Sequence, residues 1–448
     1  MKNKKNIIYI ITILVLILFL GLFWILIINN NKTGSNKGDS SSGKPEMNKN
    51  SSVSYSSAKE ITTSEDISSG TYKSSNADEN AIMLSGKITS NLSNLTIEKT
   101  GDSNGGDNTS FYGTNSAILA KGGAVVTIKN ANITTDATGA NGVFSYGGSA
   151  KTNNSSSDGT TINISDSTIT TYKGNSGGIM TTGGGTTNAK NLTITTSGQS
   201  SAAIRSDRGG GTVNVDGGTY TSNGVGSPAI YSTADITVKN AKLISTTSEG
   251  VIIEGKNSIT LENVELTDTH TKNVKSKTYK NIFIYQSMSG DAAEGVATFT
   301  AKDSTITTNN GDSFYVSNTS AVINLTNNKI INNDPNGYFL RAQKDSWGKE
   351  GINGGIVTLN LTNQKVNGNI GVDSISKLTM KLTSNSSFVG AINSNNEGEV
   401  NLTIDKTSSI TLTGNTYVKS FTNDDTTNSN INLNGYKLYI NGTEFSKY

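Results

Sequence analysis

The sequence predicts an all-β protein, a single-stranded right-handed parallel β-helix preceded by an N-terminal transmembrane helix. The β-helix is indicated by a phrase that returns from about residue 80 to the C-terminus: an alternating apolar/polar strand, a polar kink of Asn, Asp or Gly, and a second short strand. Its closest copies lie roughly 21 to 23 residues apart, a spacing typical of solenoids. Stacked coils of this kind form one continuous domain.

The composition of the copies selects the kind of solenoid. They are built of Thr, Val, Ile, Ser, Asn and Gly, which favour strands and turns over helices. A leucine-rich repeat would need a ladder of Leu, and helical repeats are longer. The chain has 48 Gly and only 3 Pro, so its turns are expected to be Gly and Asn turns. The clearest copies are VVTIKNANITT at 125–135, TINISDSTITT at 161–171, ITVKNAKLIST at 236–246 and ITLENVELTDT at 259–269.

Another short strand recurs once in each coil and sets the predicted register. It is largely apolar, and a Gly-rich turn such as TTGGG or DRGGG follows several of its copies. Its copies include NAIMLS at 80–85, SAAIRS at 201–206, SPAIYS at 227–232, EGVIIE at 249–254 and DSFYVS at 312–317.

The residues before the repeats divide into three predicted segments. Residues 1–6 carry three lysines and form a basic cytoplasmic stub. Residues 7–28 are almost uninterruptedly apolar and would span about 33 Å as a helix, enough to cross a bilayer. This run is longer than the core of a typical signal peptide and ends without a small-residue cleavage site, so it favours an uncleaved signal anchor over a cleaved one. By the positive-inside rule, the lysines keep the N-terminus cytoplasmic. The chain then crosses the membrane once, and the residues after the span are extracellular.

Residues 29–60 are rich in Ser, Asn, Lys and Gly and are predicted to be a disordered tether. Residues 61–448 are predicted to be the β-helix domain. Its last segment, INLNGYKLYINGTEF at 431–445, is expected to form a hairpin that caps the open end of the solenoid.

Charge and residue types argue against several function classes. The formal net charge is +2 over 448 residues, and no basic stripe alternates with aromatic residues, which argues against a nucleic-acid partner. The chain has no cysteine, so disulfides and a lipoprotein anchor are excluded. Its single histidine, His270, is expected in an exposed loop, TDTHTKN at 267–273. No catalytic residue and no metal ligand is predicted, because Ser-His-Asp, Cys-His and His-based metal sites would all need that histidine.

Aligned copies of the short strand bring aromatic and charged residues into one predicted row. The row faces outward if the Ile before each of its members points inward. Its expected members are Phe144, Met180, Arg205, Tyr231, Ile253, either Ile284 or Tyr285, and Tyr315, with Asp207, Arg208 and Glu254 beside it. Tyr, Phe and Arg near carboxylates could stack on sugar rings and bind their hydroxyls.

The predicted binding residues are therefore Phe144, Arg205, Asp207, Tyr231, Glu254, Tyr285 and Tyr315. Two alternatives stay open. A register shift of one residue would turn the row into the core, and a long insertion could cover it.

Two loops are further candidates. The loop at 100–115 has the composition of a calcium loop through Asp102 and Asp107, but Gly113 stands where an EF-hand has its closing Glu. Calcium is thus possible there, although no cofactor is expected. The loop at 341–351, RAQKDSWGKEG, breaks the repeat; it is either a projecting contact loop or an insertion whose Trp347 packs back on the rod.

Four segments resemble a group of exported bacterial adhesin-like proteins of unassigned function, within the pectate-lyase-like class of right-handed β-helices. They are GGGTVNVDGGTYTS at 209–222, SPAIYSTADITVKNA at 227–241, IEGKNSITLENVEL at 253–266 and IYQSMSGDA at 284–292. The resemblance extends over most of the repeat region and implies the fold. Polysaccharide lyases of this class use clustered Asp with calcium and a catalytic Arg or Lys; no such cluster stands at stacked positions here, so no catalytic role is carried over.

The resemblance and the residues together imply a membrane-anchored extracellular protein that binds a surface glycan or a host or cell-wall ligand without catalysis. One alternative is a polysaccharide lyase or glycoside hydrolase acting near Arg205, Asp207 and Glu254. Another is a structural spacer at the cell surface.

Overall fold

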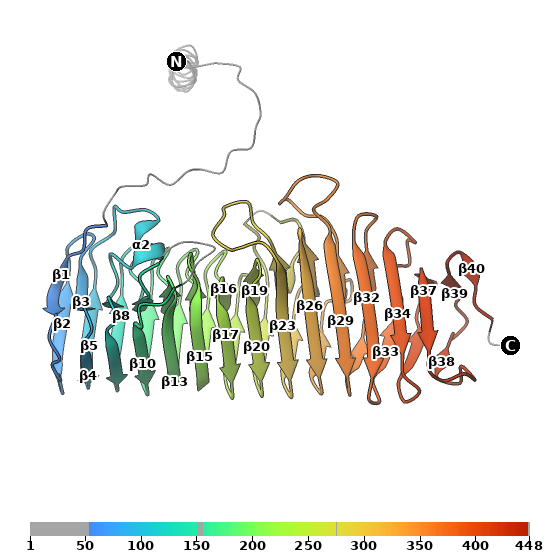
Figure 1. The fold of residues 1–448 in the computed structure, drawn as a ribbon, viewed down its shortest axis with the longest axis horizontal. Helices are drawn as coiled ribbons and strands as arrows, with labels where there is room; N and C mark the ends of the chain where they lie inside the picture. The colour runs from blue at the N-terminus through green and yellow to red at the C-terminus, as the bar shows by residue number, and fades with distance from the viewer. Residues whose placement is uncertain (1–52, 150–155, 275, 447–448) are drawn as a thin grey trace, which may run out of the picture. The chain divides into compact units, whose positions relative to one another are not determined.

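The computed structural model describes residues 53–149, 156–274 and 276–446, and these residues form a parallel β-helix (Figure 1). The predicted stub, the apolar segment 7–28 and the tether up to residue 52 lie outside the described residues. Within the described part, no helix has the length and hydropathy of a membrane span. The predicted all-β class and the repeat are confirmed, and the first strand, Ser57–Ile61, begins before the predicted boundary at residue 61.

One sheet takes a single strand from each of twelve successive coils, and all its pairings are parallel. We call it the first sheet. Its strands are β1 (Ser57–Ile61), β3 (Asn80–Ser85), β6 (Ile118–Lys121), β9 (Val143–Tyr146), β12 (Ile179–Thr182), β14 (Ile204–Ser206), β16 (Ile230–Ser232), β19 (Val251–Glu254), β22 (Lys280–Tyr285), β25 (Asp312–Ser317), β28 (Leu340–Ala342) and β31 (Ile370–Val372).

A second sheet of 21 strands holds the repeated phrase, and each strand pairs with those of neighbouring coils (Figure 1). Its strands are β2 (Gly70–Ser74), β4 (Thr89–Ser93), β5 (Leu95–Lys99), β7 (Val125–Lys129), β8 (Asn132–Thr135), β10 (Thr161–Ser165), β11 (Thr168–Thr171), β13 (Gly185–Thr196), β15 (Gly211–Ser222), β17 (Asp235–Lys239), β18 (Lys242–Ser245), β20 (Ser258–Glu262), β21 (Glu265–Asp268), β23 (Val296–Lys302), β24 (Thr305–Thr308), β26 (Thr319–Thr326), β27 (Lys329–Asn332), β29 (Gly355–Thr362), β32 (Lys377–Thr383), β34 (Glu399–Ile404) and β37 (Ser420–Asn423).

Two small sheets complete the C-terminal coils. The only antiparallel pairing among the described strands joins β39 to β40 in a short hairpin. The strands are β30 (Lys365–Asn367), β33 (Ser387–Gly390), β35 (Ser409–Leu412) and β38 (Ile431–Asn432) in one sheet, and β36 (Thr416–Val418), β39 (Leu438–Ile440) and β40 (Thr443–Glu444) in the other. One short helix, α2 (Asn108–Tyr112), lies in a loop of the first coils.

The polar kink between the two strands of the repeated phrase adopts a left-handed backbone. Asn240 and Asn263 have φ of 52° and 54°, a conformation that Asn reaches more easily than other side chains because its short amide bonds locally. The Nδ2 of Asn263 donates to the Oδ1 of Asn240 at 2.8 Å, and Asn240 donates to Asp216 at 2.7 Å. These side chains thus form a ladder that ties each kink to the one before it.

We expect replacement of Asn263 by Val to cost about 2 kcal/mol of unfolding free energy, because a β-branched residue is strained at positive φ and breaks the ladder. Replacement by Gly should cost less than half as much, since Gly tolerates that backbone. Urea denaturation of both variants checks this; equal losses would show that the hydrogen bonds, and not the backbone, set the preference.

The interior holds a polar ladder beside the apolar core. At the end of the second strand of the repeated phrase, stacked inward positions carry small hydroxyl side chains in most coils. We call these residues the inner polar ladder: Lys99, Thr135, Thr171, Thr196, Ser222, Ser245, Asp268 and Thr308. All of them are buried. Thr196 and Ser222 share a hydrogen bond of 3.0 Å, but neither carboxylate oxygen of Asp268 has a well-formed hydrogen bond with any described residue.

Candidate functional site

The predicted row exists on the outer side of the first sheet. The register pairs Phe144 with Met180, Met180 with Arg205, and Arg205 with Tyr231. We use the name outward row for these stacked residues: Phe144, Met180, Arg205, Tyr231, Ile252, Phe283 and Tyr315. Its apolar members form two clusters separate from the main core, as expected for side chains on the opposite side of the sheet.

Two positions of the expected row are wrong. Ile253 and Ile284 belong to the main core, and Ile252 and Phe283 take their places in the row. Tyr285 is paired with Glu254 two positions further along the strands, on the same outer side. Both sides of β19 and β22 are buried, so alternation alone could not fix which residue of each pair faces the core.

Insertions cover much of the outward row. This is the second of the two alternatives left open by the sequence, in which a long insertion covers the row. Phe144 and Tyr315 are 0% and 1% exposed. Gly113, next to α2, lies so close to the Phe144 ring that a Cβ there would stand 2.7 Å from it. Trp347 packs back on the rod, with its ring centroid 5.2 Å from that of Tyr285 and 5.5 Å from that of Phe283. The expected open stacking surface is therefore contradicted at Phe144, Tyr285 and Tyr315.

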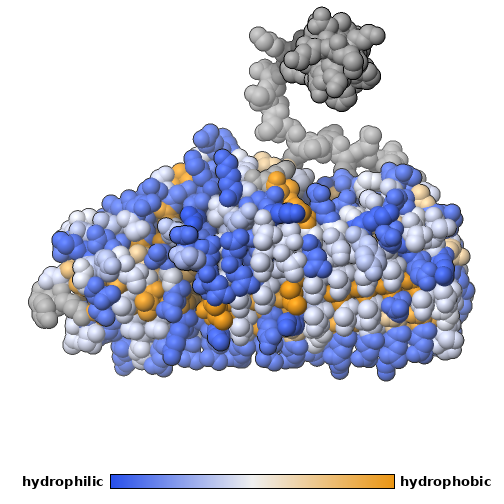
Figure 2. Space-filling model, turned by 180° about the vertical axis from the view of Figure 1, so that it is seen from behind, coloured by the Kyte–Doolittle hydropathy of each residue, from blue (hydrophilic) through white to orange (hydrophobic). Residues whose placement is uncertain are grey.

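The cover is less complete at Arg205 and Tyr231 than over the rest of the row, and the Arg205 side chain is 11% exposed. The two side chains line a pocket of about 180 Å³. Its other lining residues are Ser200, Ala202, Gly226 and Pro228. We call this the Arg205–Tyr231 pocket. The face of the rod shown in Figure 2 is mainly hydrophilic, with hydrophobic residues in narrow strips and small patches.

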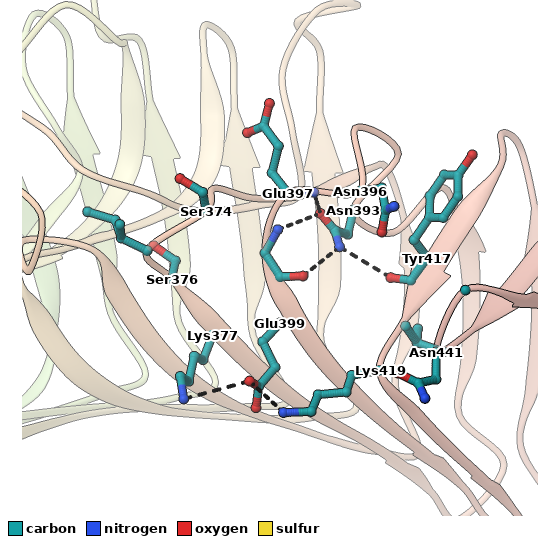
Figure 3. A pocket seen from close by; sticks show the side chains of 14 residues that line it. Ser374, Ser376, Lys377, Asn393, Asn396, Glu397, Glu399, Tyr417, Lys419 and Asn441 are labelled. Atoms are coloured by element: carbon teal, nitrogen blue, oxygen red, sulfur yellow. Dashed lines mark hydrogen bonds and ion pairs between the residues drawn. The ribbon is translucent and has the colours of Figure 1, made fainter.

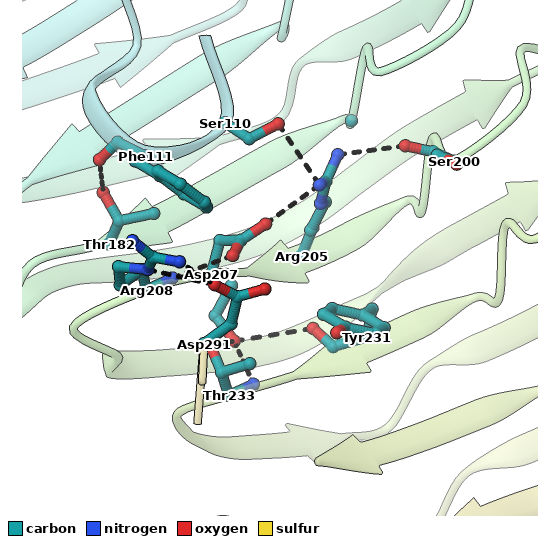
Figure 4. Close-up of polar contacts among 12 residues, drawn as sticks. Ser110, Phe111, Thr182, Ser200, Arg205, Asp207, Arg208, Tyr231, Thr233 and Asp291 are labelled. Atoms are coloured by element: carbon teal, nitrogen blue, oxygen red, sulfur yellow. Dashed lines mark hydrogen bonds and ion pairs between the residues drawn. The ribbon is translucent and has the colours of Figure 1, made fainter. Parts of the chain in front are cut away.

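Arg205 is held in place by three neighbours (Figure 4). Its guanidinium donates to the carbonyl of Ser200 at 2.9 Å, to Oγ of Ser110 at 3.3 Å and to Oδ2 of Asp207 at 2.9 Å. Ser110 belongs to α2, so the helix-bearing loop reaches the row here. Burial raises the pKa of Asp207 to about 6, against the opposing effect of Arg205.

A second ion pair joins the next insertion to this network. Arg208 donates to Oδ1 of Asp291 from its Nε at 3.0 Å and through a second nitrogen, and its guanidinium lies 4.3 Å from the centre of the Phe111 ring. Asp291 lies in the loop after β22, and Phe111 lies in α2 (Figure 4). Arg208 thus bridges the two insertions that flank the pocket.

Glu254 lies at the end of β19 and is buried under the same loop. Its carboxylate accepts hydrogen bonds from the hydroxyls of Tyr231, Tyr285 and Ser287, the Tyr285 bond being 3.2 Å long. Burial raises the pKa of Glu254, and burial together with the Glu254 charge raises the pKa of Tyr231 well above its ordinary value. Glu254 therefore fixes the Tyr231 ring that forms one wall of the pocket.

The Arg205–Tyr231 pocket and its surroundings are suited to binding a polar ligand against one aromatic wall. Two guanidinium groups, three carboxylates and two phenols come together, and the carboxylates are Asp207, Glu254 and Asp291. Among the residues that the structure describes, no group of three or more His, Asp or Glu side chains is placed to hold a metal ion. Asp102 of the candidate calcium loop accepts from the Thr138 amide at 2.7 Å and pairs with Lys173 at 3.4 Å.

His270 does not lie in an exposed loop as predicted. It is buried, and its ring nitrogens lie 3.0 Å from the Lys280 carbonyl and 3.1 Å from the Lys272 carbonyl. The ring thereby pins the insertion before β22 against the rod, and burial lowers its pKa.

A larger pocket near the C-terminal end was not predicted from the sequence (Figure 3). It has a volume of about 370 Å³ and combines Tyr417 with Asn393, Glu397 and the ion pairs of Glu399. The Tyr417 ring stacks on Tyr439 of the next coil, with centroids 4.8 Å apart. The two rings stack because the same strand position repeats in successive coils, about 4.8 Å apart.

Comparison of the sequence with family models, with curated proteins and with solved structures finds no match. The resemblance to adhesin-like β-helices therefore stays a prediction.

Proposed function

We propose that this chain is an extracellular adhesin-like β-helix that binds a surface glycan, without catalysis, at the Arg205–Tyr231 pocket. One observation carries the proposal: the cover over the outward row is incomplete at Arg205 and Tyr231, where a guanidinium and a phenol ring line one pocket. Sugar rings present apolar faces and hydroxyl edges, which suit an aromatic wall and a multidentate donor respectively.

The pocket is rigid enough for selective binding. Arg205 is fixed by Ser110, Ser200 and Asp207, and the Tyr231 hydroxyl is fixed by Glu254. Side chains that are already ordered lose little conformational entropy when a ligand arrives. Since the two guanidinium groups face three carboxylates, the site favours a neutral sugar over an acidic one.

The proposal also includes the membrane anchor and the right-handed winding of the β-helix. Residues 7–28 would hold the β-helix at the outer side of the cell membrane, and residues 29–52 would extend it from the surface. The coils would wind right-handed, since crossovers between parallel strands of one sheet do so almost without exception.

A lyase or hydrolase is the second candidate, favoured by the raised pKa values of Asp207 and Glu254. Two carboxyl groups with raised pKa values could supply a general acid. Both are buried, however, and Glu254 has three hydroxyl donors around it, which favours a positioning role.

The full chain, in detergent, should be retained on an array of neutral and acidic polysaccharides, with product release assayed in parallel. We expect Tyr231→Ala and Arg205→Ala each to weaken retention at least about tenfold, as for central residues of other binding sites. Tyr172→Ala is the matched control, because Tyr172 is 52% exposed and lies outside the pocket. Retention unaffected by both pocket variants would overturn the site, release of sugar products would favour the enzyme, and no retention at all would favour the spacer.

A further inference from the structure

Lys280, at the start of β22, is buried with two carboxylates near its amine. The side chain is 0% exposed, and its Nζ lies 3.8 Å from Oδ2 of Asp345 and 4.0 Å from Oε1 of Glu249. Asp345 belongs to the insertion after β28, and Glu249 lies just before β19. Three segments far apart in the sequence therefore meet at one amine.

The surroundings of this amine are dry and aromatic. The Nζ lies 4.5 Å from the centre of the Phe283 ring and 4.9 Å from that of Tyr315, and its one short hydrogen bond goes to the Thr278 carbonyl at 2.9 Å. Burial lowers the pKa of Lys280, partly opposed by Glu249 and Asp345. Desolvation of this kind raises the share of neutral amine, which is the nucleophilic form of lysine.

Asp345 is oriented toward Lys280 by its own partners. Its Oδ2 accepts from Oγ of Ser276 at 2.6 Å, and its Oδ1 accepts from the Ser346 amide at 2.6 Å. Glu249 is held by Oγ of Ser248 at 2.5 Å. The amine, the acceptor carboxyl and a second carboxyl thus stand as a fixed group, named here the Lys280 triad (Lys280, Asp345 and Glu249).

We propose that the Lys280 triad forms an intramolecular isopeptide bond between Lys280 and Asp345, with Glu249 carrying the proton. The cross-link would tie the insertion that holds Trp347 to the first sheet and so fix the cover over Phe283 and Tyr315.

The reaction balances without any cofactor. The neutral Lys280 amine attacks Cγ of the Asp345 carboxyl group, and a bond forms between Nζ and Cγ. Glu249 takes a proton from the attacking nitrogen and returns it to the departing hydroxyl, so the Cγ–O bond breaks and one water leaves. Nothing is oxidised or reduced. Holding both groups in one site offsets the cost of condensation in water, because effective molarities of positioned groups reach about 10⁵ M or more.

Intact mass spectrometry of the purified full chain tests the proposal directly. We expect a mass lower than that of the sequence by one water. Tryptic digestion should then leave residues 278–302 joined to residues 345–349, because the cross-linked Lys280 is no longer a cleavage site. A full-length mass without loss of water after prolonged incubation at neutral pH would overturn the proposal.

Three variants separate chemistry from folding. Glu249→Gln keeps the shape of the triad but removes the proton carrier, so the joined peptide should fall by at least about tenfold, the lower part of the range for acid–base catalysis. Lys280→Met and Asp345→Ala should abolish it. Far-UV circular dichroism reports whether each variant folds. A folded Glu249→Gln protein with a full yield of joined peptide would rule out the role of Glu249, and joined peptide in a folded Asp345→Ala protein would rule out the acceptor.

Discussion

Replacement of Asp268 by Thr should stabilise the β-helix by about 2 to 4 kcal/mol at neutral pH, because it removes a buried carboxyl group that no described side chain pairs with. Asp268 is 0% exposed and stands in the inner polar ladder between Ser245 and Thr308. A threonine hydroxyl at the same position would continue a row that already holds Ser and Thr.

The destabilising effect of Asp268 should grow as the pH rises. Burial and the nearby Glu249 charge raise the pKa of Asp268 well above its ordinary value, against the smaller opposing effect of the His270 backbone amide. The folded state therefore binds a proton that the unfolded state has lost. The contribution of Asp268 is therefore most favourable below pH of about 4, the unfolded value, and is lost as pH rises toward the folded value, at about 1.4 kcal/mol per unit.

Urea denaturation of the wild type and of Asp268→Thr at pH 5 and pH 8 measures both effects. The variant should be more stable at both pH values, with the larger gain at pH 8. Asp235→Thr is the matched control, since Asp235 is exposed on β17, and it should change stability by less than about 0.5 kcal/mol. A destabilised Asp268→Thr protein would show that Asp268 has a favourable partner in solution.

Replacement of Glu254 by Ala should cost about 3 kcal/mol of unfolding free energy, because the buried hydroxyls of Tyr231 and Tyr285 and that of Ser287 lose their acceptor. The loop after β22 should loosen first, since Ser287 belongs to it. Urea denaturation gives the cost, and limited proteolysis with thermolysin at the exposed Met288 reports on the loop.

Glu254→Gln is the control for this prediction. Its amide keeps one carbonyl acceptor of the same reach, so it should lose less than half as much stability as the Ala variant. Wild-type stability and wild-type proteolysis in both variants would show that Glu254 does not hold the loop.

The structure of one coil could be predicted because several independent sequence features indicate the same coil. The kinks at Asn240 and Asn263, the alternation between them and the short apolar strand repeat at nearly one spacing, so a misreading in one coil is corrected by its neighbours. The outer side of the sheet was harder. At β19, Ile252 and Ile253 are both apolar and both buried, and only the register of neighbouring strands shows which one faces outward.

The cover over the outward row could not be predicted, because its contacts join insertions to distant coils. Arg208 meets Asp291 and Arg205 meets Ser110, in segments whose composition is that of ordinary Gly- and Ser-rich loops. His270 illustrates the same limit. A polar sequence around a lone histidine favours an exposed loop, yet the segment folds back and binds the ring through the Lys280 and Lys272 carbonyls.

The strict parallel register also bears on how such a chain can evolve. Apart from the C-terminal hairpin, each described strand pairs only with the coil before and the coil after, and the insertions leave that pairing intact. If one whole coil were duplicated or lost, each remaining strand would still pair with an equivalent strand of a neighbouring coil. The length of the β-helix would change by about 4.8 Å. The number of coils can therefore set the distance between the two ends of the β-helix without any change within a coil.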